Sequence, residues 1–196
     1  MKTKALIVFA LMAFIVMPAA AQTGAPGGAA PAPAANSALT GLKFAWNRVK
    51  DISVRAAEKM PEENYAFKPS PDVRSFGQLV AHAADANFMF AQLAAGEAMT
   101  PRDIEKTKTG KADLVAALKE SFAACDRAFA KNDADLAPAL KLFGVETNRF
   151  AAVGLMVGHN WEHYGNMVTY MRIKGIVPPS SEPRPDAPKP PAAPAK

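Results

Sequence analysis

Two of the three histidines in this 196-residue chain lie four residues apart, in the segment GHNWEHYGNMVTYMRIKG. On an α-helix, a step of four residues is a rotation of about 400°, which places the imidazoles of His159 and His163 on one face, one turn apart. Two neutral imidazoles placed in this way can bind one metal ion. Hydrogen-bonded core histidines have the same spacing, so the pair alone leaves both interpretations open.

The third histidine, His82, falls in a second helical pattern, on an apolar stripe with Leu79, Ala86 and Leu93. We therefore expect it to face the same bundle interior as the pair. Three imidazoles from two facing helices would leave coordination positions open, which is typical of a catalytic rather than a structural metal site. The alternative is three hydrogen-bonded core or rim histidines in a structural helical domain without metal.

His159, Glu162 and His163 also spell H-x-x-E-H, the pattern of a class of zinc proteases in which the glutamate is the general base. Such proteases need an acidic third ligand downstream on a folded element. The side-chain carboxylates that follow His163, Glu182 and Asp186, lie in a proline-rich segment, so a protease is not predicted. Glu162 is a weak candidate for a catalytic base, beside two other interpretations: a group that orients an imidazole, and a solvated side chain.

Apolar residues at three- and four-residue steps predict four helices and no convincing strand. The expected helices span about residues 37–59, 75–96, 112–131 and 147–174. Ser75 and Gln78 form a capping-box pattern at the start of the second helix, and Gly175 can end the fourth. Cys125, the only cysteine, lies on the apolar stripe of the third helix and is expected to be a core residue.

The segments between these helices are longer than tight helix hairpins need. One of them can run the length of the bundle, so the predicted fold class is all-α, a four-helix bundle with a long crossover connection.

The first 21 residues have a basic start, a short apolar run and an A-x-A end, which is typical of a secretory signal peptide cleaved after Ala21. We therefore expect an exported protein, periplasmic or extracellular, with no stable membrane anchor. Residues 22–36 are predicted to be a flexible Ala/Pro/Gly-rich segment, 37–178 the helical domain, and 179–196 a Pro-rich disordered tail.

The charge balance gives little support to a polyanionic partner. Without Lys2 and Lys4, 21 basic and 18 acidic residues leave a net charge of about +3. Basic residues gather between 102 and 111, but Asp103 and Glu105 interrupt them and no aromatic residue lies among them. This pattern is typical of a solvated loop, so no nucleic-acid partner is predicted.

Over most of residues 37–180 the chain resembles the DinB-like (DinB/YfiT) helical bundle proteins. The resemblance rests on PEENYAFKPSPDVRSFGQLVAH, which ends at the first histidine, and on HNWEHYGNMVTYMRIKGIVPPS, which holds the other two. It implies a four-helix bundle with a crossover, frequent dimers, and one divalent metal ion, zinc or nickel, held by three histidines. The family's ligands map to His82, His159 and His163.

The resemblance is compatible with an enzyme, since some relatives are thiol-dependent transferases and others are metal-dependent hydrolases or isomerases, while many have no known reaction. We favour hydrolase-like chemistry on an unknown small molecule, because intracellular thiols fit an exported protein poorly. The alternatives are a thiol-dependent transferase and a non-catalytic bundle that binds a metal or small molecule; a homodimer is also compatible with the sequence. Candidates for supporting groups are Asp85, Asn160, Glu162 and Asn166, the last standing where the family commonly has glutamine.

Overall fold

The computed structural model describes residues 37–183 of the chain. The predicted signal peptide (1–21), the predicted flexible segment (22–36) and residues 184–196 of the predicted tail lie outside the described residues.

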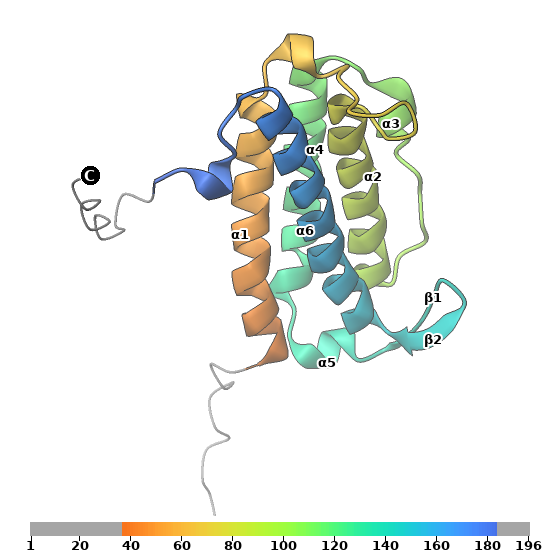
Figure 1. Cartoon of the computed structure of the whole chain (residues 1–196). Helices are drawn as coiled ribbons and strands as arrows, with labels where there is room; N and C mark the ends of the chain where they lie inside the picture. Colours follow the sequence, from red (N-terminus) through yellow and green to blue (C-terminus); the bar gives the residue numbers. More distant parts are fainter. Residues whose placement is uncertain (1–36, 184–196) are drawn as a thin grey trace, which may run out of the picture. The chain divides into compact units, whose positions relative to one another are not determined.

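Four long helices form the bundle, which confirms the predicted all-α fold (Figure 1). They are α1 (Ala38–Lys59), α2 (Phe76–Ala95), α4 (Lys111–Asp126) and α6 (Arg149–Ile173). Helix α2 packs against α4 and α6, and α1 packs against the same two helices. The first two helices of the chain therefore lie diagonally across the bundle, joined through a short 3-10 helix, η1 (Glu62–Asn64).

The connection between α2 and α4 is the crossover that the sequence predicted. Figure 1 shows the chain leaving the end of α2, returning along the bundle and entering α4 so that the two helices run in the same direction. The two helices are in contact, and Asn87 on α2 donates to Ser121 on α4 at 3.1 Å. The crossover contains one short helix, α3 (Ile104–Thr107), which packs on α2.

The prediction that the chain has no strand was wrong. Between α4 and α6 lie the 3-10 helix η2 (Ala128–Ala130), the short helix α5 (Asp133–Leu136) and a hairpin of two antiparallel strands, β1 (Ala139–Leu142) and β2 (Val145–Asn148). Both turn residues, Phe143 and Gly144, have positive φ (49° and 85°), as a type I′ turn requires. Each strand has only four residues and Leu142 alone is buried, so no alternating pattern marks them in the sequence.

The start of α2, the core position of Cys125 and the end of α6 agree with the sequence-based predictions. Ser75 and Gln78 form the predicted capping box, with Gln78 N donating to Ser75 Oγ and Ser75 N donating to Gln78 Oε1. Cys125 is buried, as predicted, and burial raises the pKa of its thiol. Gly175 adopts the left-handed conformation after α6.

The chain remains packed against the bundle beyond residue 178. The 3-10 helix η3 (Pro179–Ser181) contacts α1, and Ser180 N donates to the Tyr164 hydroxyl at 2.9 Å. Glu182 pairs with Arg55 and, at 2.6 Å, with Lys59 on α1. Contacts of the helical domain thus extend at least four residues past its predicted boundary.

Within residues 37–183, no helix combines the length and the apolar character needed to cross a membrane.

Candidate metal centre

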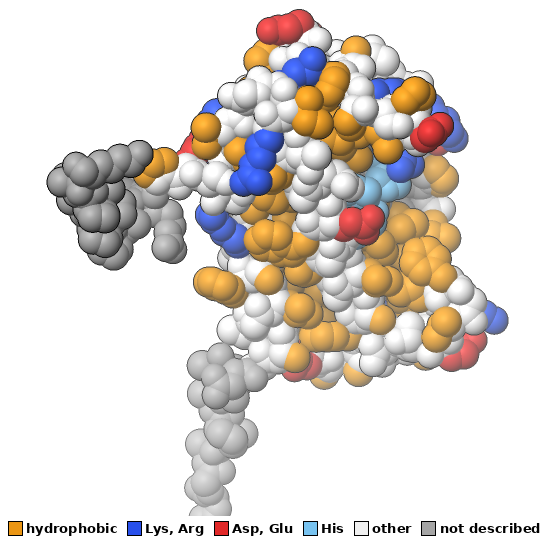
Figure 2. Space-filling model, viewed as in Figure 1, with side chains coloured by type: hydrophobic (Ala, Val, Ile, Leu, Met, Phe, Trp, Pro, Cys, Tyr) orange, Lys and Arg blue, Asp and Glu red, His pale blue; other side chains and the backbone are white. Residues whose placement is uncertain are grey.

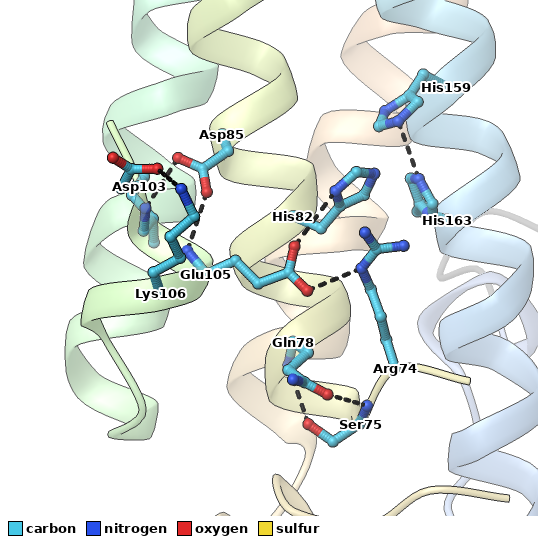
Figure 3. Close-up of polar contacts among 11 residues, drawn as sticks. Arg74, Ser75, Gln78, His82, Asp85, Asp103, Glu105, Lys106, His159 and His163 are labelled. Atoms are coloured by element: carbon cyan, nitrogen blue, oxygen red, sulfur yellow. Dashed lines mark hydrogen bonds and ion pairs between the residues drawn. The ribbon is translucent and has the colours of Figure 1, made fainter. Parts of the chain in front are cut away.

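The three histidines lie together on two facing helices. His82 projects from α2 toward His159 and His163 on α6 (Figure 3). One ligand nitrogen from each side chain can be chosen so that all three atoms lie within 4.8 Å of one another. The ring centroids are 4.2 Å apart for His159 and His163, and 4.8 and 5.2 Å from His82 to His163 and His159 respectively. The structure therefore brings together the three residues that the sequence predicted as one site.

The surroundings favour the neutral form of these imidazoles. Burial, followed by the neighbouring His163 and His82, lowers the pKa of His159 to about 4. Burial also lowers the pKa values of His82 and His163, with Arg74 as the next cause for His82 and His82 for His163. A neutral imidazole has a lone pair to offer, which is the form that binds a metal.

The histidine pair does not satisfy its own hydrogen-bonding groups. His159 Nε2 and His163 Nε2 are 3.0 Å apart, and the Nδ1 atoms of both residues are buried without a partner. If one Nε2 donates to the other, one buried N–H and one buried lone pair stay unpaired whichever ring is the donor.

Nitrogen separations of 3.0 to 4.8 Å bracket the spacing of about 3.3 Å between ligands that lie about 2.0 Å from one tetrahedral ion. These three residues fit a divalent cation.

Glu105 is the carboxylate that faces the histidine cluster. Its Oε2 lies 3.5 Å from His82 Nδ1, and its Oε1 accepts a hydrogen bond from Arg74 Nε at 2.9 Å. A carboxylate on Nδ1 favours the tautomer that leaves Nε2 of His82 available as a ligand. This role of Glu105 was not predicted from the sequence, because the residue lies in the crossover, in a segment with the pattern of a solvated loop.

Asp85 supports Glu105 rather than a histidine. Its two carboxylate oxygens accept hydrogen bonds from the backbone nitrogens of Ile104 and Glu105, both at 2.9 Å. These are the first two residues of α3, whose N-terminal N–H groups lack helical partners. Asp85 therefore fixes the start of α3, and Figure 3 shows α3 directing Glu105 toward His82 and Arg74.

Asn160 was expected to support the site, and the structure places it in the core instead. Its side-chain nitrogen donates to Asn87 Oδ1 at 2.6 Å and to Met156 O at 2.8 Å. Asn87 in turn donates to Ser121, so this buried network links α6, α2 and α4. Asn160 follows His159 by one residue, a rotation of about 100° that turns it away from the cluster.

Two cavities flank the histidines. The first cavity, of about 730 Å³, touches His82 and His159 and is lined mainly by apolar side chains. The second cavity, of about 700 Å³, touches His163 and is lined by several polar side chains, Arg74 and Asn166 among them. Glu162 is solvent-exposed and borders both cavities.

Replacing Glu105 with glutamine should weaken divalent-metal binding by about 10- to 100-fold, as the loss of a group that orients a ligand commonly does. The neutral amide holds the Nδ1 proton of His82 less strongly than the carboxylate does. Isothermal titration with Zn²⁺ and Ni²⁺ measures the change. Glu63→Gln is the control, because Glu63 is exposed on η1, and equal affinities of the two variants would contradict the role given to Glu105.

The metal-free protein should lose stability as the pH falls from 6.5 toward 4. Over this interval the unfolded chain protonates its histidines, whereas native His159 stays neutral until its pKa of about 4. The unfolded state then binds more protons, so the free energy of unfolding decreases as the pH decreases. Urea denaturation with chelator at several pH values checks this, and His159→Gln should flatten the dependence. A free energy of unfolding that stays constant or increases between pH 6.5 and 5 would contradict it.

Known proteins share this architecture. The family model for the DinB superfamily matches residues 45–167, more than half of the chain. A DinB-like protein from Bacillus cereus ATCC 10987 has a similar structure, with a TM-score of 0.62 and 16% sequence identity, over 71% of this chain and 94% of that chain. The DinB-like protein YjoA from Bacillus subtilis is also similar, with a TM-score of 0.55 and 22% identity, over 69% of this chain and 92% of that chain.

At these identities the likeness of the structures concerns the fold. No protein of curated function is similar enough to this chain to give a match. The match to the family model and the crossover bundle agree on one assignment. The chain belongs to the DinB superfamily.

Proposed function

We propose that this protein is a metal-dependent enzyme with hydrolase-like chemistry, in which His82, His159 and His163 hold one divalent ion, zinc or nickel. The observation that carries the proposal is the convergence of three imidazoles from two helices between two cavities. A divalent ion bound by three protein ligands supplies a Lewis acid with room for a substrate or water. The substrate is a small molecule, since the site opens into cavities of molecular size.

The residues around the histidine cluster have separate roles in this proposal. Glu105, held by Asp85 and Arg74, orients His82. The Tyr170 hydroxyl donates to Arg74 O at 2.6 Å and so fixes the backbone that carries this arginine. Glu162 borders both cavities and can accept a proton from a molecule bound in either of them.

A non-catalytic protein that binds a metal or small molecule is the second proposal. The observation that favours it is the state of the carboxylates beside the histidines: Glu105 is engaged with Arg74, and Glu162 makes no hydrogen bond to His159 or His163. Three further proposals come from the sequence: export of the protein, a thiol-dependent transfer reaction and formation of a homodimer. No nucleic-acid partner is proposed.

Hydrolysis of a panel of ester, amide and lactone substrates by the zinc- or nickel-loaded protein separates the two proposals. A hydrolase should lose its rate in His159→Ala and should be slowed about 100-fold or more in Glu162→Gln, as loss of a general base predicts. Glu120→Gln is the matched control, since Glu120 is exposed on α4 and borders neither cavity. Equal rates in Glu162→Gln and the wild type would remove Glu162 from the mechanism, and metal binding without turnover of any substrate would favour the binding protein.

A further inference from the structure

We propose that the first cavity, beside His82 and His159, takes a predominantly apolar small molecule without negative charge, which defines the substrate class of the site. This inference rests on the proposed function for the chemistry that follows binding, but the binding itself does not require a metal.

Four separate segments contribute apolar side chains to this cavity. Helix α2 and the crossover that follows it supply Ala86, Met89, Phe90 and Met99, the hairpin turn supplies Phe143, and α6 supplies Leu155. The cavity volume of about 730 Å³ lies within the range of about 300–1,000 Å³ that holds small organic ligands. His82 and His159 also line the cavity, and the Phe90 ring meets His159 edge to face, with 5.7 Å between centroids.

Three of the lining side chains are large, apolar and unusually exposed. Met99 is 60% exposed, Phe143 74% and Leu155 41%. They come from three different segments yet converge on one cavity. In Figure 2, hydrophobic side chains (orange) cover much of the surface between the pale-blue histidine patch and the β-hairpin. Apolar groups that gather in this way mark a binding site for an apolar partner.

The backbone at the cavity rim is also unusual. Among residues 37–183, Asp103 and Phe143 are the non-glycine residues with positive φ (51° and 49°), and both line this cavity. The first position of a type I′ turn favours asparagine or glycine, so turn chemistry does not account for a phenylalanine there. Residues held in such conformations gather at ligand sites. A ligand contact by the Phe143 ring explains why an aromatic residue occupies this position.

The charges around the cavity disfavour an anionic ligand. The acidic residues that line it are Asp85, Asp103 and Glu162. Arg102 is the basic residue among the lining side chains, and its guanidinium lies over the Phe88 ring, 4.6 Å from the centroid. An anionic ligand would therefore meet three carboxylates and one guanidinium that is already in contact with an aromatic ring. The second cavity differs in this respect, because Lys68 and Arg74 line it.

Two fluorescent probes of nearly the same shape test the inference on the full chain with chelator present. N-phenyl-1-naphthylamine is neutral and apolar, and 8-anilino-1-naphthalenesulfonate adds one negative charge. We expect the neutral probe to bind the wild type more tightly than the sulfonate. Phe143→Asn should weaken the neutral probe about tenfold, since much of the ring's apolar contact is lost. Asparagine suits the turn, so this variant should fold.

Phe44→Asn is the matched control, because Phe44 is 81% exposed on α1 and lies outside the cavity. It should change the affinity for the neutral probe less than twofold. The inference is overturned if the neutral probe fails to bind, if Phe143→Asn binds it as tightly as the wild type, or if the sulfonate binds equally well. Metal content, measured on the same variants, should be unchanged. If the neutral probe binds but the protein holds no metal, the apolar binding site is supported and the proposed function is rejected.

Discussion

Replacing His163 with alanine should lower the affinity for Zn²⁺ and Ni²⁺ by more than about 100-fold, because the loss of a ligand exceeds the effect of losing a group that merely orients one. His163 is the most enclosed of the three histidines, being 6% exposed, and its Nε2 lies 3.0 Å from that of His159. Removing the His163 side chain leaves two imidazoles on different helices, so the metal site loses one of its three protein ligands. Competition titration with a chromophoric chelator measures the affinity of the wild type and the variant.

Asn166→Ala is the control for this experiment. Asn166 is exposed one turn along the same helix and borders the second cavity. Its removal tests whether any change on this face of α6 disturbs metal binding. Similar affinities of His163→Ala and the wild type would exclude His163 as a ligand, and a similar loss in Asn166→Ala would point to a general disturbance of α6.

Replacing Trp46 with alanine should lower the free energy of unfolding by about 3–5 kcal/mol, the usual cost of removing a large aromatic side chain from a core. Trp46 is fully buried, with ring centroids 5.1 Å from those of Phe122 and Phe129. Its indole nitrogen donates to Asp126 Oδ1 at 2.8 Å. The substitution would leave a cavity between α1 and the end of α4. Urea denaturation followed by circular dichroism gives the difference.

Phe44→Ala provides a comparison within the same helix. Phe44 precedes Trp46 by two residues and is 81% exposed, so its truncation should change the free energy of unfolding by less than about 0.5 kcal/mol. If the two substitutions had equal effects, the packing of α1 described above would be incorrect.

The sequence predicted the long helices and the histidine cluster because both depend on local periodicity. A four-residue step fixes the relation of His159 to His163, and the apolar stripe around His82 fixes which face of α2 is buried. The capping box at Ser75 is equally local and was found in place. Such features need no knowledge of which helices are neighbours.

Features that depend on distant segments escaped prediction. Glu105 reaches His82 because the crossover folds back on α2 and Asp85 holds the start of α3, and no spacing rule links these three residues. Asn160 was placed in the wrong environment because a polar residue beside a histidine can face either the site or a core network. The hairpin was missed because only one of its eight strand residues is buried.

Metal analysis of the purified protein tests the central claim most directly. The wild type and a His82→Ala, His159→Ala, His163→Ala triple variant are prepared without chelator or affinity tag, and their metal content is measured before and after divalent ions are added. We predict close to one divalent ion per wild-type chain and none in the variant. Absence of metal from the wild type even after zinc and nickel are supplied, or equal metal in both proteins, would contradict the assignment of these histidines as ligands.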